Sequence, residues 1–99
     1  MNYDTLRCIL QGIRKSGGGA TGTPVDATVN AVMGGANPTG PAVTTLLGTP
    51  LSAFFPPGAC DPATIWANIA ACVSGDPTTV PPGFDCTTKL VDLMPPAGS

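Results

Sequence analysis

Four cysteines spread over 99 residues set the strongest limit on how this chain can fold. An even number of cysteines in a small chain predicts a pair of disulfides rather than free thiols. A zinc site is disfavoured because zinc ligands usually come in closely spaced pairs, often with histidine, and this chain has no histidine. The cysteines are Cys8, Cys60, Cys72 and Cys86.

The helix expected between Cys60 and Cys72 restricts their pairing. Such a helix extends roughly 18 Å, whereas the Cα atoms of a disulfide lie within about 7 Å of each other, so these two cysteines should not pair. Two connectivities remain open. We favour Cys8–Cys60 with Cys72–Cys86, because the second bridge closes a short proline-rich connection between two helices. The alternative is Cys8–Cys72 with Cys60–Cys86.

Glycine and proline divide the chain into short apolar segments. The 13 glycines and 12 prolines have no regular period and stand between stretches with helical spacing of apolar residues. We therefore expect an all-α fold, a single small domain over 1–99 with five or six short helices and long Gly/Pro-rich loops. Segment 16–22 reads as a flexible linker and 95–99 as a tail. The expected helices are 3–15, 24–33, 41–47, 62–73 and 85–94, with a short helical turn at 51–55.

Threonine or aspartate precedes proline at four places, a pattern typical of a helix start. The four pairs begin at Thr23, Thr49, Asp61 and Asp76. Asp85 is a further candidate cap, for the last helix.

The helix expected at 62–73 has only two polar side chains, Thr64 and Asn68, four residues apart. A helix that is apolar nearly all round is buried on most sides, so we expect it to be the central helix of the fold.

Charge is scarce. Charged residues make up 10% of the chain, where about 25% is typical, and Asp61 is the only one between residues 27 and 75. Binding to nucleic acid is not expected, because it needs a dense basic surface and the chain has only four basic residues. No stretch is long and apolar enough to predict a transmembrane helix.

The residue types for catalysis are also missing. With no histidine and no glutamate, general acid–base chemistry would fall to aspartates, three of which (Asp61, Asp76 and Asp85) are candidate helix caps. No C-x-x-C motif, phosphate loop or clustered carboxylate set is present. We expect no enzyme activity, no catalytic residues, no metal and no cofactor.

The disulfides predict an oxidising location, either extracellular or on the exterior of a particle. No signal peptide is visible, because residues 1–15 carry charge throughout. A free monomer with so few charges is poorly protected against association with other molecules. The leading interpretation is therefore a structural or interaction subunit that packs apolar faces against itself or against a larger assembly, such as a particle, a filament or a multisubunit complex.

Two alternatives remain open. In the first, the chain is a secreted carrier of a lipid or other apolar small molecule, with basic side chains contacting an anionic headgroup. In the second, it is a secreted effector that binds a receptor. Phe54 and Phe55 are adjacent, and adjacent side chains of a regular element face opposite ways. We favour the interpretation that one packs in the core and the other under the Pro-Pro loop; the alternative is that one of them forms an outward apolar contact. The candidate apolar residues are Phe54, Phe55, Trp66, Ile69 and Met94, and the candidate basic contacts are Arg7, Arg14 and Lys15.

Overall fold

The computed structural model describes residues 1–95; residues 96–99, which form most of the predicted tail, lie outside the described part. Over residues 1–95 the chain is helical and has no strand, apart from one isolated antiparallel bridge between Pro50 and Lys89. The all-α prediction is confirmed, and five α-helices fit the expected number. The elements are α1 (Tyr3–Lys15), α2 (Asp26–Met33), α3 (Pro41–Leu47), the 3₁₀ helix η1 (Leu51–Phe54), α4 (Pro62–Ile69), the 3₁₀ helix η2 (Ala70–Val73) and α5 (Leu90–Leu93).

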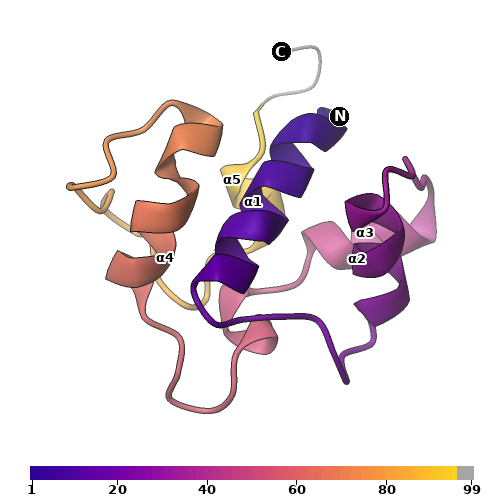
Figure 1. Cartoon of the computed structure of the whole chain (residues 1–99), viewed down its shortest axis with the longest axis horizontal. Helices are drawn as coiled ribbons and strands as arrows, with labels where there is room; N and C mark the ends of the chain where they lie inside the picture. The colour runs from indigo at the N-terminus through magenta and orange to yellow at the C-terminus, as the bar shows by residue number, and fades with distance from the viewer. Residues whose placement is uncertain (96–99) are drawn as a thin grey trace.

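Helix α1 lies at the centre of the fold, with α4 on one side and α2 and α3 on the other (Figure 1). It has the predicted bounds. The Asn2 side chain caps its first turn by accepting a hydrogen bond from the Thr5 N–H at 3.1 Å. One face of the helix is buried and packs against α2, α4 and η2, namely Leu6, Ile9, Leu10, Gly12 and Ile13.

Helix α4 is not the central helix that its apolar sequence predicts. The expected helix 62–73 is α-helical only to Ile69 and continues as η2. Its outer face is exposed, and that face is made of alanines. Hydropathy counts alanine as apolar, but a methyl group is small enough to be exposed at little cost, so composition overstated the burial. The exposed alanines are Ala63, Ala67 and Ala71, and the buried side chains of α4 are Ile65, Trp66 and Ile69.

Helices α1 and α4 approach each other closely at Gly12. A Cβ atom at this position would lie 2.5 Å from Ile69 Cγ2 and 2.7 Å from the Asn68 carbonyl oxygen. Beside this contact, Asn68 Nδ2 donates to Ser16 Oγ at 2.8 Å, and Ser16 Oγ donates to the Gly12 carbonyl at 2.8 Å. The polar side chain of Asn68 therefore joins the two helices instead of facing water.

Of the candidate helix starts, Asp61 is confirmed as a cap and Thr23 is not. Asp61 caps α4 as predicted, because its carboxylate accepts a hydrogen bond from the Ala63 N–H at 3.2 Å. Thr23 does not cap a helix: its hydroxyl donates backwards to the Ala20 carbonyl, and α2 begins only at Asp26, two residues later than expected. A threonine hydroxyl can satisfy a preceding carbonyl as readily as it caps a following helix.

The last helix is shorter than predicted. We expected 85–94, but α5 begins at Leu90. Asp85 is not its cap, because its carboxylate accepts hydrogen bonds from Thr87 within a separate turn. Asp92 instead accepts a hydrogen bond from the Lys89 N–H at 3.2 Å and stabilises the start of α5.

Segment 16–22 is packed against η1, which differs from the free linker that its glycine content predicts. The Gly19 N–H donates to the Phe54 carbonyl at 2.8 Å. A Cβ atom at Gly18 would lie 2.8 Å from Phe55 Cζ and 2.9 Å from Ile13 Cγ2. Gly18 therefore serves close packing, and Ala20 is buried.

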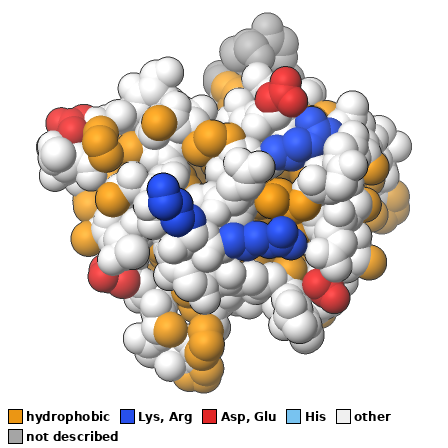
Figure 2. Space-filling view, in the orientation of Figure 1, with side chains coloured by type: hydrophobic (Ala, Val, Ile, Leu, Met, Phe, Trp, Pro, Cys, Tyr) orange, Lys and Arg blue, Asp and Glu red, His pale blue; other side chains and the backbone are white. Residues whose placement is uncertain are grey.

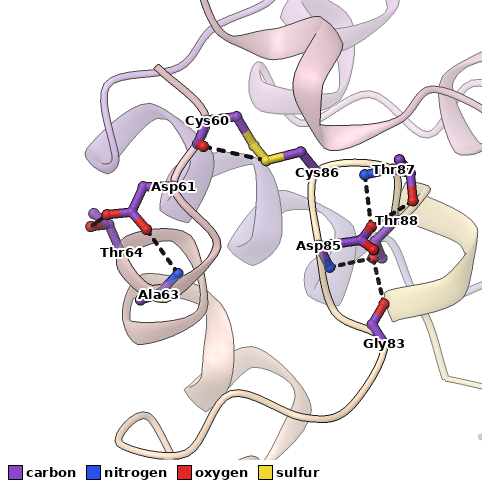
Figure 3. Close-up of a disulfide and its surroundings, with 9 residues drawn as sticks. All are labelled: Cys60, Asp61, Ala63, Thr64, Gly83, Asp85, Cys86, Thr87 and Thr88. Atoms are coloured by element: carbon purple, nitrogen blue, oxygen red, sulfur yellow. Dashed lines mark hydrogen bonds between the residues drawn. A yellow bond between two sulfur atoms is a disulfide. The ribbon is translucent and has the colours of Figure 1, made fainter. Parts of the chain in front are cut away.

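The two predicted disulfides are present, but the connectivity that we favoured, Cys8–Cys60 with Cys72–Cys86, is wrong. Cys8 of α1 pairs with Cys72 of η2 because these two helices pack side by side, with their Cα atoms 5.7 Å apart. Cys60 pairs with Cys86 at a Cα separation of 6.2 Å (Figure 3). The Ser52 N–H donates to the Cys86 carbonyl at 3.0 Å, which holds segment 86–89 beside the region of η1. Two disulfides indicate an oxidising environment.

Replacing Gly12 by alanine should destabilise the protein. The new methyl group has no room between α1 and α4, so overpacking should lower the free energy of unfolding by about 1–3 kcal/mol. Urea unfolding followed by circular dichroism measures this change. Gly19→Ala is the control, because a Cβ atom there meets nothing within 4 Å. Equal effects of the two substitutions would contradict the close-packing account.

Removing the two disulfides separately should cost different amounts. The loops span 64 and 26 residues, and the chain-entropy estimate assigns them about 4 and about 3.5 kcal/mol. We expect Cys8→Ala/Cys72→Ala to lose more stability in urea than Cys60→Ala/Cys86→Ala. The opposite order would show that local packing outweighs loop length.

Candidate functional site

An apolar groove lies between η2, α5 and the connection that precedes α5. One hollow of about 420 Å³ is lined by side chains of α4, η2, α5 and segment 81–84. A second, of about 330 Å³, also borders Val73 and Leu93, so the two adjoin along these residues. We call them together the α5 groove. Its principal apolar lining is Trp66, Val73, Pro81, Phe84, Leu93 and Met94.

The Trp66 ring is held firmly at the floor of this groove. Its indole Nε1 donates to the Asp76 carbonyl at 2.7 Å. Gly75 lies against the ring so closely that a Cβ atom there would be 2.6 Å from Trp66 Cζ2. The Phe84 ring meets Trp66 edge to face, with centroids 5.2 Å apart and an interplanar angle of 62°. The two rings are therefore fixed in place, and because Trp66 is only 5% and Phe84 only 9% exposed, they form the base of the groove and leave little of their surface open in it.

One carboxylate lines the groove, and two others belong to Asp76, whose carbonyl accepts a hydrogen bond from Trp66, and to Asp85, which follows Phe84. Asp92 lines it directly and is exposed. Hydrogen bonds from the side chain and then the backbone N–H of Thr78 lower the pKa of the Asp76 carboxyl. Thr87 lowers the pKa of the Asp85 carboxyl in the same way, again through its side chain first. Asp76 and Asp85 therefore keep their negative charge to a lower pH than ordinary aspartates do.

Phe54 and Phe55 lie elsewhere, and both are buried, with exposed fractions of 3% and 9%. The favoured interpretation, in which both rings pack inside the protein, is confirmed, and the alternative of an outward contact is wrong. The 3₁₀ helix ends at Phe54, and Phe55 is extended with φ −128° and ψ 151°, so the change of backbone conformation turns both rings inward. Together with Gly17–Gly19 they line a separate hollow of about 380 Å³.

The structure does not bring the five predicted apolar residues into one cavity. Trp66 and Met94 line adjoining parts of the α5 groove, whereas Phe54 and Phe55 line the other hollow. Ile69 is fully buried and contacts the α1 backbone at Gly12. These five side chains therefore do not form the single internal cavity that the carrier interpretation expects.

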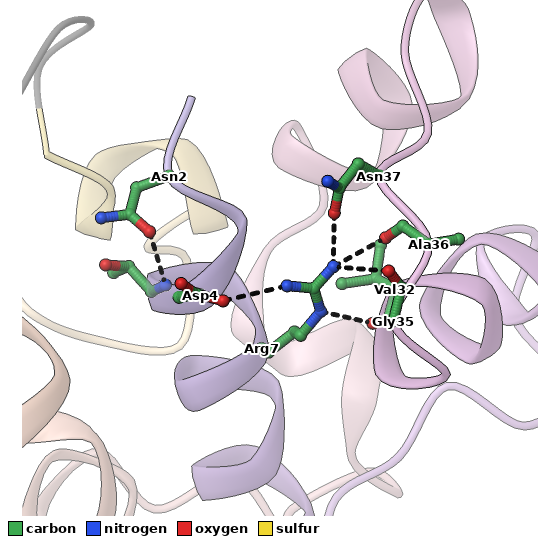
Figure 4. A network of polar contacts seen from close by, with 8 residues as sticks. Asn2, Asp4, Arg7, Val32, Gly35, Ala36 and Asn37 are labelled. Carbon is green, nitrogen blue, oxygen red and sulfur yellow. Dashed lines mark hydrogen bonds and ion pairs between the residues drawn. The ribbon is translucent and has the colours of Figure 1, made fainter.

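Arg7, a predicted anion contact, is engaged within the chain (Figure 4). Its Nε donates to the Val32 carbonyl at 2.9 Å, and Nη2 donates to the carbonyls of Gly35 and Ala36 at 3.0 Å each. Asn37 Oδ1 accepts from Nη2 as well, and Nη1 pairs with Asp4 at 3.1 Å. The guanidinium thus satisfies carbonyls at and beyond the C-terminal end of α2 and ties this segment to α1.

The other two predicted basic contacts lie in the last turn of α1. Arg14 Nη2 donates to Asn30 Oδ1 at 3.3 Å, and Lys15 is exposed. The basic side chains lie over the face that carries α1 (Figure 2). The α5 groove has Asp92 in its lining. Acidic side chains also lie on the α1 face, where Asp4 pairs with Arg7 (Figure 2).

The residue types in and around the groove indicate which ligands suit it. Over residues 1–95 no three His, Cys, Asp or Glu side chains group as metal ligands would, and no helix has the length and hydropathy to cross a membrane. The groove offers aromatic, aliphatic and proline surface beside a carboxylate. Such a surface suits the binding of an apolar segment accompanied by a cation.

Sequence reasoning missed Phe84, Val73 and Leu93 as groove residues. A signal for Phe84 was present in the preceding Pro-Pro-Gly. The Phe84 N–H donates to the Pro81 carbonyl at 3.2 Å and Gly83 has φ 82°, the backbone of a tight turn with glycine at its third position. This turn folds the chain back and directs Phe84 toward Trp66.

A search of protein-family models, of curated proteins and of solved structures found no significant match to this chain.

Removing the Thr78 hydroxyl should change the titration of Asp76. We expect Thr78→Val to raise the pKa of Asp76 toward its ordinary value of 3.8, because the largest cause of its lowering is lost. Since the folded pKa lies below the unfolded one, these hydrogen bonds stabilise the fold above the unfolded pKa, and this is lost as the pH falls through the folded pKa. Carboxyl ¹³C NMR titration measures the shift. Thr79→Val, which removes the weakest contribution, should move it less.

Proposed function

We propose that this chain is a non-enzymatic interaction subunit that binds copies of itself or a larger assembly through the α5 groove. The observation that supports this most is the preformed aromatic floor of the groove. Trp66 is fixed by a hydrogen bond and by Gly75, and Phe84 packs on it edge to face. The two rings are 5% and 9% exposed, so they give the groove a rigid base on which a partner could pack without reordering it.

The scarcity of charge supports the same proposal. The chain has ten charged residues in 99, and apolar side chains near the groove are open to solvent. Val91 of α5 is 48% exposed, while Leu93 and Met94 are partly buried. Partly exposed apolar side chains that line a hollow, as Leu93 and Met94 do, can form a contact with another protein.

The proposed location is extracellular or the exterior of a particle. Disulfides persist where the surroundings are oxidising, and two of them join elements of this small fold. The secreted carrier and the receptor-binding effector remain alternatives. The carrier has less support, because the predicted cavity residues line two separate hollows.

Native mass spectrometry of the purified protein without reductant tests the proposal. We expect a mass lower by four hydrogens, as two disulfides require, and a defined multimer or a co-purified protein partner. Trp66 is the only tryptophan and lines the groove, so its fluorescence should change as the assembly is diluted apart. A monomer that carries a lipid-sized adduct would contradict the proposal and support the carrier.

A further inference from the structure

The peptide bond between Asp76 and Pro77 lies in an exposed turn that follows η2. Residues 76–80 are all exposed, and they belong to the loop at the left edge of the molecule in Figure 1. The Thr79 N–H donates to the Asp76 carbonyl at 3.2 Å and closes the turn. Water and solvent protons therefore have access to this bond.

The Asp76 carbonyl oxygen accepts two N–H hydrogen bonds. Besides the Thr79 N–H, Trp66 Nε1 donates to it at 2.7 Å. The indole is held in this position because Trp66 is buried and Gly75 packs against its ring. Hydrogen bonds of this kind strengthen when the oxygen gains negative charge, so the two donors favour a tetrahedral intermediate at this carbonyl.

The carboxylate of Asp76 lies beside the same bond. Its Oδ1 accepts hydrogen bonds from Thr78 Oγ1 at 2.7 Å and from the Thr78 N–H at 2.9 Å. A side chain that binds the N–H two residues further on spans the peptide bond between them. The carboxylate is therefore held near the Asp76 carbonyl carbon and the Pro77 nitrogen.

The same hydrogen bonds keep this carboxylate ionised in acid. The side chain of Thr78 and then its N–H lower the pKa of the Asp76 carboxyl. Within residues 1–95 the salt bridge present joins Arg7 to Asp4 on α1, so no charged group pairs with Asp76. The nucleophilic, ionised form of Asp76 therefore persists to a lower pH than that of an ordinary aspartate.

Pro77 supplies the leaving group. Its nitrogen carries two alkyl substituents in addition to the carbonyl and is more basic than an ordinary peptide nitrogen, so acid protonates and expels it more readily. Because proline has no N–H, no hydrogen bond retains that nitrogen in the turn.

We propose that the Asp76–Pro77 bond is a self-cleavage site in acid solution, where Trp66 stabilises the intermediate. A carboxylate oxygen of Asp76 forms a bond to the Asp76 carbonyl carbon. The bond from this carbon to the Pro77 nitrogen then breaks, and the nitrogen keeps the electron pair and takes a proton from solvent. The resulting cyclic anhydride adds one water molecule and opens to two carboxyl groups.

The products are residues 1–76 and 77–99. Each chain reacts once, so this is not enzymatic turnover, and the inference does not depend on the proposed function. The cut frees one end of the segment that leads to Pro81 and Phe84, two residues of the α5 groove. Acid would thus alter the lining of this groove permanently.

The chain contains its own comparison at Asp61–Pro62. Asp61 Oδ1 likewise accepts the N–H two residues further on, from Ala63 at 3.2 Å. Its carbonyl accepts the Ile65 N–H at 3.0 Å as a hydrogen bond of α4, whereas the Asp76 carbonyl has the Trp66 indole in addition to its turn hydrogen bond. The two bonds share their chemistry and differ in this fixed donor.

Mass spectrometry of the full chain held in dilute acid measures cleavage at both bonds. Circular dichroism first identifies the lowest pH at which the fold is intact, and the incubation is done there. Samples are reduced before analysis, because the Cys60–Cys86 disulfide joins the two sides of the 76–77 bond. The same chain, reduced and unfolded in urea at that pH, gives the intrinsic rate of each bond.

We expect the folded protein to cleave 76–77 roughly tenfold faster than 61–62, less than a buried oxyanion hole achieves because this turn is open to water. In the unfolded chain the two rates should be similar. Trp66→Phe keeps an aromatic ring and removes the N–H, so it should bring the two rates closer together. Asp76→Asn should abolish cleavage at 76–77, while the matched control Asp61→Asn should leave it unchanged.

Equal rates at the two bonds in the folded protein would overturn the inference. So would a folded Trp66→Phe variant that cleaves like the wild type. If Trp66→Phe does not fold, the wild type decides, because a ratio of rates that is the same in the folded and unfolded chain means that the fold does not promote cleavage. None of these results bears on the proposed function, which native mass spectrometry of the uncut protein tests separately.

Discussion

The close approach of α1 and α4 at Gly12 is the contact on which most of the structure depends. Because position 12 has no side chain, Ile69 and the Asn68 backbone lie directly on the α1 backbone. One turn earlier in α1, the Cys8–Cys72 disulfide joins this helix to η2, which directly follows α4. This fixes α4, and α4 carries Trp66 to the floor of the α5 groove. On its other side, α1 holds α2 through Arg7, so one helix orders both halves of the molecule.

Polar groups in this protein mainly position apolar ones. The indole N–H of Trp66 reaches the Asp76 carbonyl and so fixes the ring that forms the groove floor. Asn68 and Ser16 join α4 to α1 beside the Gly12 contact. Over residues 1–95, every buried side-chain nitrogen or oxygen has a hydrogen-bond partner. Charged residues are few, and several uncharged polar groups determine the geometry of the apolar surface.

Some local signals predicted the structure correctly, while the expected caps at Thr23 and Asp85 and the favoured long-range pairing of the cysteines were wrong. The periodicity of apolar residues predicted α1 with its observed bounds, and Asp61 marked the start of α4. Pairing of the cysteines depended on which helices pack together, and a single sequence does not contain this information. Hydropathy placed α4 at the centre because it does not separate alanine, which tolerates exposure, from isoleucine, which does not. Phe84 was missed because its role depends on a turn that directs it to a distant ring.

The arrangement of the disulfides has a consequence for what happens to the protein when its backbone is cut. Exposed turns with small residues are where proteases cut first, and both segment 56–59 and segment 76–80 are exposed. A cut in segment 56–59 leaves fragments joined through Cys8 and Cys72. A cut in 76–80 leaves them joined through Cys60 and Cys86. Either nick yields a two-chain molecule whose pieces cannot diffuse apart, so the groove can outlast a broken backbone.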